Sequence, residues 1–312
     1  MRDTVEGTVL KSTGSRYIVE CTHGRVLSCS IRGKFRLKGI RNTNPVAVGD
    51  NVAVEPDAGV EHSGVIVGIS PRKNYIIRKS TNLSKEAHII ASNVDRAFIV
   101  VTLKMPETTF TFVDRFLASA EAYRIPASIV FNKADIYKDD IDYLAQWIDT
   151  YQLAGYDWLL TSTLTGQGVD ELKMLMKDKI SVFAGHSGVG KSSLANSVEP
   201  GLELKTSKIS ESRHKSGKHT TTFAEMFRLS FGGAIIDTPG IRAFGVLDMA
   251  KEEISHFFPE IFKYSEVCRF NNCTHTNEPN CAVKQAVEDE LIASTRYNSY
   301  LGLLEDDTKH RM

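Results

Sequence analysis

One segment of the sequence combines closely spaced glycines with a lysine and a serine, a composition suited to binding phosphate. Residues 185–192 read GHSGVGKS and match the phosphate-loop pattern of a glycine, four variable residues and Gly-Lys-Ser. In such a loop, backbone N–H groups surround phosphate oxygens at the start of a helix, Lys191 contacts the β- and γ-phosphates, and Ser192 binds Mg²⁺. The candidate phosphate-contacting residues are Gly185, His186, Ser187, Gly188, Val189, Gly190, Lys191, Ser192 and Ser193.

A second motif related to phosphate, DTPG, comes later in the chain at residues 237–240. It follows the apolar run 234–236, so Asp237 is expected at the carboxyl end of a strand, where α/β sheets bind their ligands. Asp237 can hold Mg²⁺ through water, and the N–H of Gly240 can sense a γ-phosphate. The motif is therefore a second part of a nucleotide site.

The segment between these two motifs, residues 207–222, is polar and ends in GKHTTT. A mobile switch in this place should supply a threonine hydroxyl to Mg²⁺ when GTP is bound, and both Thr221 and Thr222 are candidates. Ile241 follows DTPG, where many GTPases carry a glutamine that orients the attacking water, and isoleucine cannot do so. His219 is the candidate in this chain to orient the attacking water. Alternatively, a partner supplies that group, and His219 is only a packed or solvated side chain.

The tetrapeptide NKAD at residues 132–135 can select a guanine base. It follows the apolar run 128–131, again at an expected strand end. The carboxylate of its aspartate can accept hydrogen bonds from guanine N1–H and the exocyclic amine, which adenine does not offer. The later sequence TST at 161–163 resembles the loop whose backbone reads guanine O6. The candidate guanine-binding residues are Asn132, Lys133, Asp135, Ser162 and Thr163.

The order of these motifs is unusual. GTPases ordinarily run from the phosphate loop through the switch threonine and DxxG to NKxD and the base loop. Here NKAD and the base loop come first, followed by the phosphate loop, the switch threonines and DTPG. A cyclic shift of the whole set indicates a circularly permuted GTPase, and it makes the segment after DTPG the direct link to the C-terminal part of the chain.

Three cysteines and one histidine lie within fourteen residues near the C-terminus. Their spacing, Cys268-x4-Cys273-x-His275-x5-Cys281, is suited to one structural Zn²⁺ with four tetrahedral ligands. The other two of the five cysteines, Cys21 and Cys29, lie on expected strands and are interpreted as small core residues.

The pattern of apolar residues predicts three domains that position these motifs. Short runs at 5–10, 16–21, 25–31, 51–55 and 64–69 are separated by turn residues and favour an N-terminal OB-type β-barrel, residues 1–75. Buried strands then alternate with amphipathic helices, which is typical of a mostly parallel α/β sheet, residues 76–245. The remainder, 246–312, is expected to be mainly helical, with an amphipathic pattern over 282–304, and to be stabilised by zinc.

Charge is distributed unevenly along the 312 residues. Residues 1–80 hold 13 Lys and Arg against 7 Asp and Glu, whereas the other 232 residues hold 25 against 31. Within the first part, residues 31–41 alternate basic and apolar side chains, which fits contact with RNA or simply a strand with one solvated face. The candidate RNA-binding residues are Arg32, Lys34, Arg36, Lys38 and Arg41. No apolar stretch is long enough for a membrane span or a secretory signal, so we expect a cytoplasmic protein without a membrane partner, by default a monomer.

Taken together, NKAD, GHSGVGKS, GKHTTT, DTPG and the cluster CRFNNCTHTNEPNC closely resemble the RsgA family, also called YjeQ or YloQ, of circularly permuted GTPases. The resemblance covers essentially the whole chain. It implies binding to the small ribosomal subunit late in its maturation, contact with 16S rRNA through the OB and zinc domains, and hydrolysis of GTP to GDP stimulated by that subunit. It also implies a catalytic role for the histidine of the GKHTTT motif, His219.

Two other functions remain open from the sequence. One is an RNA-binding switch that senses GTP and GDP with negligible catalysis, which Ile241 favours. The other is a metabolic GTPase, such as a metal-insertion factor, that carries metal on its cysteines, although a closed set of four ligands argues against it.

Overall fold

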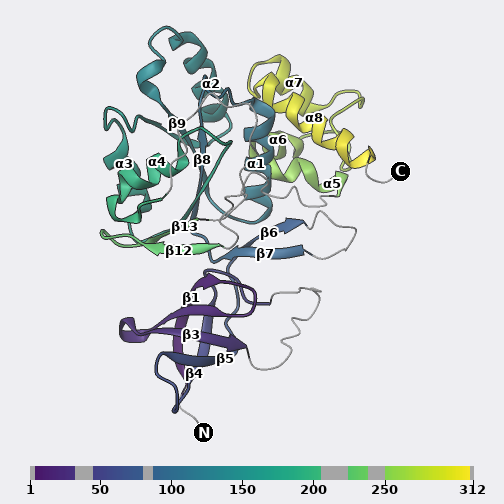
Figure 1. The fold of residues 1–312 in the computed structure, drawn as a ribbon. Helices are drawn as coiled ribbons and strands as arrows, with labels where there is room; N and C mark the ends of the chain where they lie inside the picture. The colour runs from purple at the N-terminus through teal and green to yellow at the C-terminus, as the bar shows by residue number, and fades with distance from the viewer. Residues whose placement is uncertain (1–3, 32–44, 80–86, 205–223, 238–249, 310–312) are drawn as a thin grey trace. The chain divides into compact units, whose positions relative to one another are not determined.

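The computed structural model describes residues 4–31, 45–79, 87–204, 224–237 and 250–309 (Figure 1). These residues belong to two compact units. The first unit is drawn from 1–96, 175–183 and 210–245, and the second from 97–174, 184–209 and 246–312. Among the described residues, no helix has the length and apolar character that crossing a membrane requires.

The first unit begins with a five-stranded β-barrel. Strand β1 pairs antiparallel with both β2 and β4, β2 pairs with β3, β3 runs parallel to β5, and β5 pairs with β4, so the sheet closes. This arrangement confirms the predicted OB-type barrel. The strands are β1 (Val5–Ser12), β2 (Tyr17–Cys21), β3 (Val26–Ile31), β4 (Asn51–Pro56) and β5 (Ser63–Ile69), with a 3₁₀ turn η1 (Thr22–Gly24) after β2.

Alternate residues of the barrel strands fill its interior. Val19, Leu27, Val54 and Ile66 are completely buried, as the period-2 pattern requires for strands with one inward face. Cys21 and Cys29 are also buried in this core, and burial raises the pKa of the Cys29 thiol to about 12, helped by the nearby Cys21. Both cysteines are therefore core residues, as predicted.

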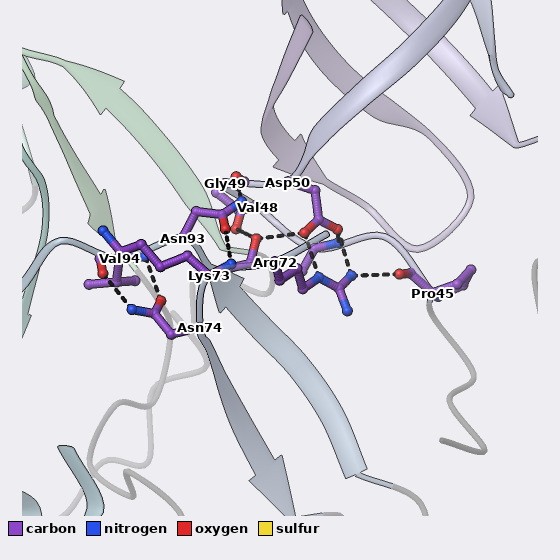
Figure 2. A network of polar contacts seen from close by, with 11 residues as sticks. Pro45, Val48, Gly49, Asp50, Arg72, Lys73, Asn74, Asn93 and Val94 are labelled. Carbon is purple, nitrogen blue, oxygen red and sulfur yellow. Dashed lines mark hydrogen bonds and ion pairs between the residues drawn. The ribbon is translucent and has the colours of Figure 1, made fainter. Parts of the chain in front are cut away.

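A β-hairpin that the sequence pattern did not predict follows the barrel. It consists of β6 (Tyr75–Lys79) and β7 (Ala87–Ser92), paired antiparallel. A polar network holds its two ends to the barrel segment 45–50 (Figure 2). At its centre, the fully buried Asp50 accepts hydrogen bonds from Arg72 at 2.6 Å and from the Ser92 hydroxyl at 2.7 Å, and Arg72 also donates to the Pro45 carbonyl at 2.8 Å.

The first unit also contains three strands from later in the chain. They are β11 (Ile180–Ala184), β12 (Glu225–Arg228) and β13 (Ala234–Asp237), with β13 parallel to β11 and antiparallel to β12. Strand β12, which was not predicted, pairs with β1 of the barrel at Lys11 and Glu225, whose side chains form an ion pair at 2.6 Å. Strand pairing therefore joins the predicted N-terminal barrel to β12, which lies in the sequence between the phosphate loop and DTPG.

The second unit contains a parallel sheet with the order β10, β9, β8. Every residue from 97 to 101 in β8 is fully buried, which explains why this strand is apolar without alternation. The elements are β8 (Arg96–Val101), α1 (Phe110–Ala122), β9 (Ala127–Asn132), η2 (Ala134–Ile136), α2 (Ile141–Leu153), β10 (Asp157–Thr161), α3 (Val169–Met176), α4 (Lys191–Val198) and η3 (Pro200–Leu202). The predicted alternation of strands and helices is confirmed.

The C-terminal part of the second unit is helical, as predicted. Its elements are α5 (Lys251–Ile254), η4 (Ser255–Phe257), α6 (Pro259–Ser265), α7 (Ala282–Glu288) and α8 (Ser294–Lys309). The amphipathic pattern expected over 282–304 belongs to two helices. The backbone N–H groups of Leu291 and Ile292 both donate to the Ala286 carbonyl, and Glu290 adopts a left-handed φ of 58°, which ends α7 before α8 begins.

Candidate functional site

Two glycines of the phosphate loop (residues 185–190), Gly185 and Gly190, are required by their neighbours. Gly185 has a φ of 136°, and a Cβ placed there would lie 2.3 Å from the Val100 carbonyl oxygen. Gly190 has a φ of 97°, and its Cβ would lie 2.4 Å from the Nδ2 atom of Asn132. Only glycine fits at these positions, so the loop approaches the ends of β8 and β9 closely.

Lys191, the first residue of α4, turns its side chain back over this loop. Its Nζ atom donates to the carbonyls of Gly185 and His186, both at 2.7 Å. The ammonium group therefore lies beside the first two residues of the loop, at the start of a helix whose N-terminus attracts anions. This is an arrangement that can bind the phosphates of a nucleotide.

Asn132, the last residue of β9, joins the guanine motif to the phosphate loop. Its side chain is almost completely buried, donates to the Val189 carbonyl at 2.8 Å, and accepts from the Thr161 hydroxyl at 3.1 Å. One amide therefore connects the ends of β9 and β10 with the loop that follows β11. Asn132 is a candidate guanine-binding residue, and its observed hydrogen bonds are to protein groups around the site.

Lys133 makes a second connection to the phosphate loop. It has a left-handed φ of 62°, and its Nζ atom donates to the Gly188 carbonyl at 2.9 Å and to the Met105 carbonyl. Burial lowers the pKa of Lys133, and the charge of Asp135 opposes this effect. The Met105 contact comes from the loop between β8 and α1, which the sequence patterns did not mark as part of the site.

Asp135 and the predicted base loop meet through a side-chain hydrogen bond. The buried Ser162 hydroxyl donates to the Asp135 carboxylate and accepts from the Thr165 backbone N–H at 3.2 Å. Thr163 follows in the same turn and is half-buried. The carboxylate predicted to read guanine N1–H and the exocyclic amine is thus oriented by the loop whose backbone is predicted to read guanine O6.

Of the predicted magnesium ligands, Ser192 and Asp237 are described. Ser192 lies in the first turn of α4, and Asp237 is the last residue of β13. Strand β13 runs parallel to β11, with Ile236 opposite Val182. Asp237 follows Ile236 and lies at the carboxyl end of its strand, as predicted. The other predicted site residues lie outside the described residues: His219, Thr221, Thr222, Gly240, Arg32, Lys34, Arg36, Lys38 and Arg41.

The predicted zinc ligands Cys268, Cys273, His275 and Cys281 converge, with all ligand atoms within 4.8 Å of one another. The Nδ1 atom of His275 lies 3.6 Å from the sulfur of Cys268 and 3.4 Å from that of Cys281, and these two sulfurs are 3.9 Å apart. Tetrahedral zinc requires about 3.6 Å between sulfur and nitrogen and about 3.8 Å between sulfurs. The four residues therefore fit a zinc ion.

The surroundings of this cluster favour the metal-binding form of the histidine. Burial lowers the pKa of His275, although the charge of Glu278 opposes this, so the imidazole is neutral at neutral pH. Glu278 organises the loop by accepting from the backbone N–H groups of Thr274 at 2.7 Å and Thr276 at 2.9 Å. The hydroxyl of Tyr300, on α8, donates to the Thr274 carbonyl at 2.7 Å.

Comparison with known proteins gives consistent relatives. The family model for the RsgA N-terminal domain matches residues 6–66, and the model for the RsgA GTPase matches residues 69–247. A protein of Bacteroides fragilis (strain YCH46), named small ribosomal subunit biogenesis GTPase RsgA, is 54% identical over 303 residues, which are 97% of each chain. A protein of the same name from Flavobacterium psychrophilum is 54% identical over 96% of this chain and 93% of its own.

Two solved structures are similar along almost their whole length. The crystal structure of YjeQ from Thermotoga maritima matches with a TM-score of 0.80 and 36% identity, over 98% of this chain and 99% of that one. The structure of YloQ, described as a circularly permuted GTPase, matches with a TM-score of 0.76 and 31% identity, over 99% and 96% of the two chains.

Proposed function

This chain belongs to the RsgA family of circularly permuted GTPases and is a GTP hydrolase, and on that premise we propose that it binds the small ribosomal subunit and acts in its late maturation. The structural observation that supports the GTPase part of this proposal is a pair of hydrogen bonds, from Asn132 to Val189 and from Lys133 to Gly188. These bonds bring the guanine motif and the phosphate loop together although their order in the chain is reversed. The relatives' name, small ribosomal subunit biogenesis GTPase, supports the partner.

Within the site, we assign GTP to the groups that converge at the strand ends. Residues 185–193 would bind the phosphates, with Lys191 as the charged contact. The carboxylate of Asp135 would read guanine, held in position by Ser162. Membership of a GTPase family implies Mg²⁺, for which we propose Ser192 and Asp237, completed by Thr221 or Thr222, and we propose that His219 orients the attacking water.

The N-terminal and C-terminal domains are proposed to bind the ribosome. OB-type barrels bind nucleic acid, and the basic run 32–41 lies in the sequence between strands β3 and β4 of the barrel, which supports contact with 16S rRNA. We retain domain boundaries near residues 75 and 245 as part of this proposal, with one structural Zn²⁺ bound by the Cys₃His cluster in the C-terminal domain. GTP and GDP would set the affinity for the subunit, and a cytoplasmic monomer is the simplest form of such a factor.

The test is steady-state GTP hydrolysis by the full chain alone, with small ribosomal subunits, and with large subunits. We expect large stimulation by small subunits and none by large ones. Lys191→Ala should abolish hydrolysis under all three conditions, whereas Lys177→Ala, at an exposed residue directly after the end of α3, should not. Equal slow rates in all three reactions would contradict the ribosomal role and favour a switch with negligible catalysis.

A further inference from the structure

Helix α1 presents different residues on two opposite faces. The helix begins after Thr109, whose side chain accepts from the Phe112 backbone N–H and so caps it. Phe112 and Asp114 are two residues apart, and successive helical residues are about 100° apart around the axis, so these side chains point to nearly opposite sides. Both side chains make contacts, and each contacts a different part of the second unit.

On one face, Phe112 contacts the phosphate loop. Its ring stacks on the imidazole of His186, the second residue of the loop, with the ring centroids 3.7 Å apart and the planes inclined by 27°. His186 also provides one of the two carbonyls that hold Lys191. The position of Phe112 therefore bears on the backbone that would surround a phosphate.

On the other face, Asp114 contacts the C-terminal helices through a buried charge cluster. Arg296 of α8 donates to Asp114 at 3.0 Å and to both oxygens of Glu260 on α6 at 2.7 and 3.0 Å. All three side chains are excluded from water, so each charge depends on this geometry for its compensation. One turn along α1, Ala118 packs into the core that these helices form. Figure 1 shows α1 beside the C-terminal helices.

Helix α8 is also attached to the metal cluster. Tyr297, the residue after Arg296, donates its hydroxyl to the carbonyl of His275, and Tyr300 donates to the carbonyl of Thr274. Contacts thus run without a break from the Cys₃His loop through α8 and α1 to His186. This route is separate from the chain segment that joins DTPG to the C-terminal domain.

We propose that α1 couples the phosphate loop to the Cys₃His loop, so that nucleotide binding and zinc binding strengthen each other, with Phe112 as the positioning residue on the nucleotide side. This proposal rests on the zinc site proposed above. A nucleotide that orders the phosphate loop fixes His186, Phe112 and the helix behind it. By thermodynamic linkage, the effect of nucleotide on zinc affinity equals the effect of zinc on nucleotide affinity.

The experiment measures zinc content and then zinc affinity of the full-length protein, by competition with a chromophoric chelator, without nucleotide and with saturating GDP. We expect one zinc per chain and about fivefold tighter zinc binding with GDP. Phe112→Ala should retain its zinc but lose the GDP effect, and should bind a fluorescent GDP analogue about two- to tenfold more weakly because the ring stacking is lost. Phe112→Tyr, which keeps the ring, should restore both.

The matched control is Phe110→Ala, the same substitution on the same helix. The Phe110 ring stacks on Trp147 of α2, with centroids 3.9 Å apart, and not on the phosphate loop, so the GDP effect on zinc should persist in this variant. Absence of zinc from the purified protein would refute the zinc site itself. The coupling would be overturned if the protein binds zinc with the same affinity with and without GDP. It would also be overturned if the effect of GDP on zinc affinity is undiminished in Phe112→Ala.

Discussion

The side-chain amide of Asn132 donates to the backbone carbonyl of Val189 at 2.8 Å, across 57 positions of the chain. The bond joins the end of β9 to the loop after β11, and the same side chain accepts from Thr161 at the end of β10. Parallel strands bring their carboxyl ends to one edge of a sheet. The nucleotide motifs can therefore meet there in any cyclic order, which is why permutation leaves the site intact.

Asn132→Ala should weaken GDP binding and also lower stability. The substitution leaves the Val189 carbonyl and the Thr161 hydroxyl without this partner, which costs about 1–3 kcal/mol in a buried place. Calorimetric titration with GDP and thermal unfolding measure the two effects. The control is Asn196→Ala, because Asn196 likewise bonds to backbone atoms, those of Leu204, but outside the site. Equal GDP affinity in both variants would contradict a role for Asn132 in shaping the nucleotide site.

Asp135→Asn should shift base preference from guanine toward xanthine. An amide at this position can donate to the additional carbonyl oxygen of xanthine, where the carboxylate accepts from the guanine amine. Competition of GDP and xanthosine diphosphate for the purified protein gives the ratio of affinities, which should fall by at least tenfold. Asp170→Asn, at a largely exposed carboxylate on α3, serves as the control. An unchanged ratio in Asp135→Asn would remove this residue from the base-reading role.

Arg72→Met should destabilise the first unit. The substitution removes the guanidinium that donates twice to Asp50 and leaves this fully buried carboxylate without its ion pair (Figure 2). Breaking a buried pair in this way costs about 3–5 kcal/mol. Urea unfolding followed by circular dichroism measures the loss, and Arg25→Met, at an exposed arginine of the barrel, should cost less than about 0.5 kcal/mol. Similar midpoints for the two variants would show that the network adds little to stability.

Removal of zinc should unfold the loop that carries Cys268, Cys273, His275 and Cys281 and loosen the helices around it. A small domain gains folding free energy from a structural metal. Titration with a strong chelator should lower the helical signal, and added Zn²⁺ should restore it. Cys281→Ala should purify without zinc, whereas Cys21→Ala, in the barrel core, should retain it. A chelated protein with unchanged helicity would indicate that the cluster does not support the fold.

Several elements were predictable because their signals are local. The alternation in β1 to β5, the continuous apolar run of β8, and the spacing of the four metal ligands each lie within a short stretch of chain, and the structure confirms the barrel, the alternating strands and helices, and the convergence of the cluster. The roles of His219, Thr221 and Thr222 stay predictions. Strand β12 and the β6–β7 hairpin were missed, because β12 has only four residues and β7 carries no clear alternation.

By itself, the sequence determined which chemical groups are available and in what order: the phosphate loop, NKAD, DTPG and the Cys₃His set. Only the tertiary structure decided which of them touch. The bond from Asn132 to Val189, the stack of Phe112 on His186 and the buried Arg296 cluster join residues far apart in the chain. Such contacts produce no periodic pattern in the sequence, because a single side chain at each end is enough to make them. Each also depends on how strands align and helices pack.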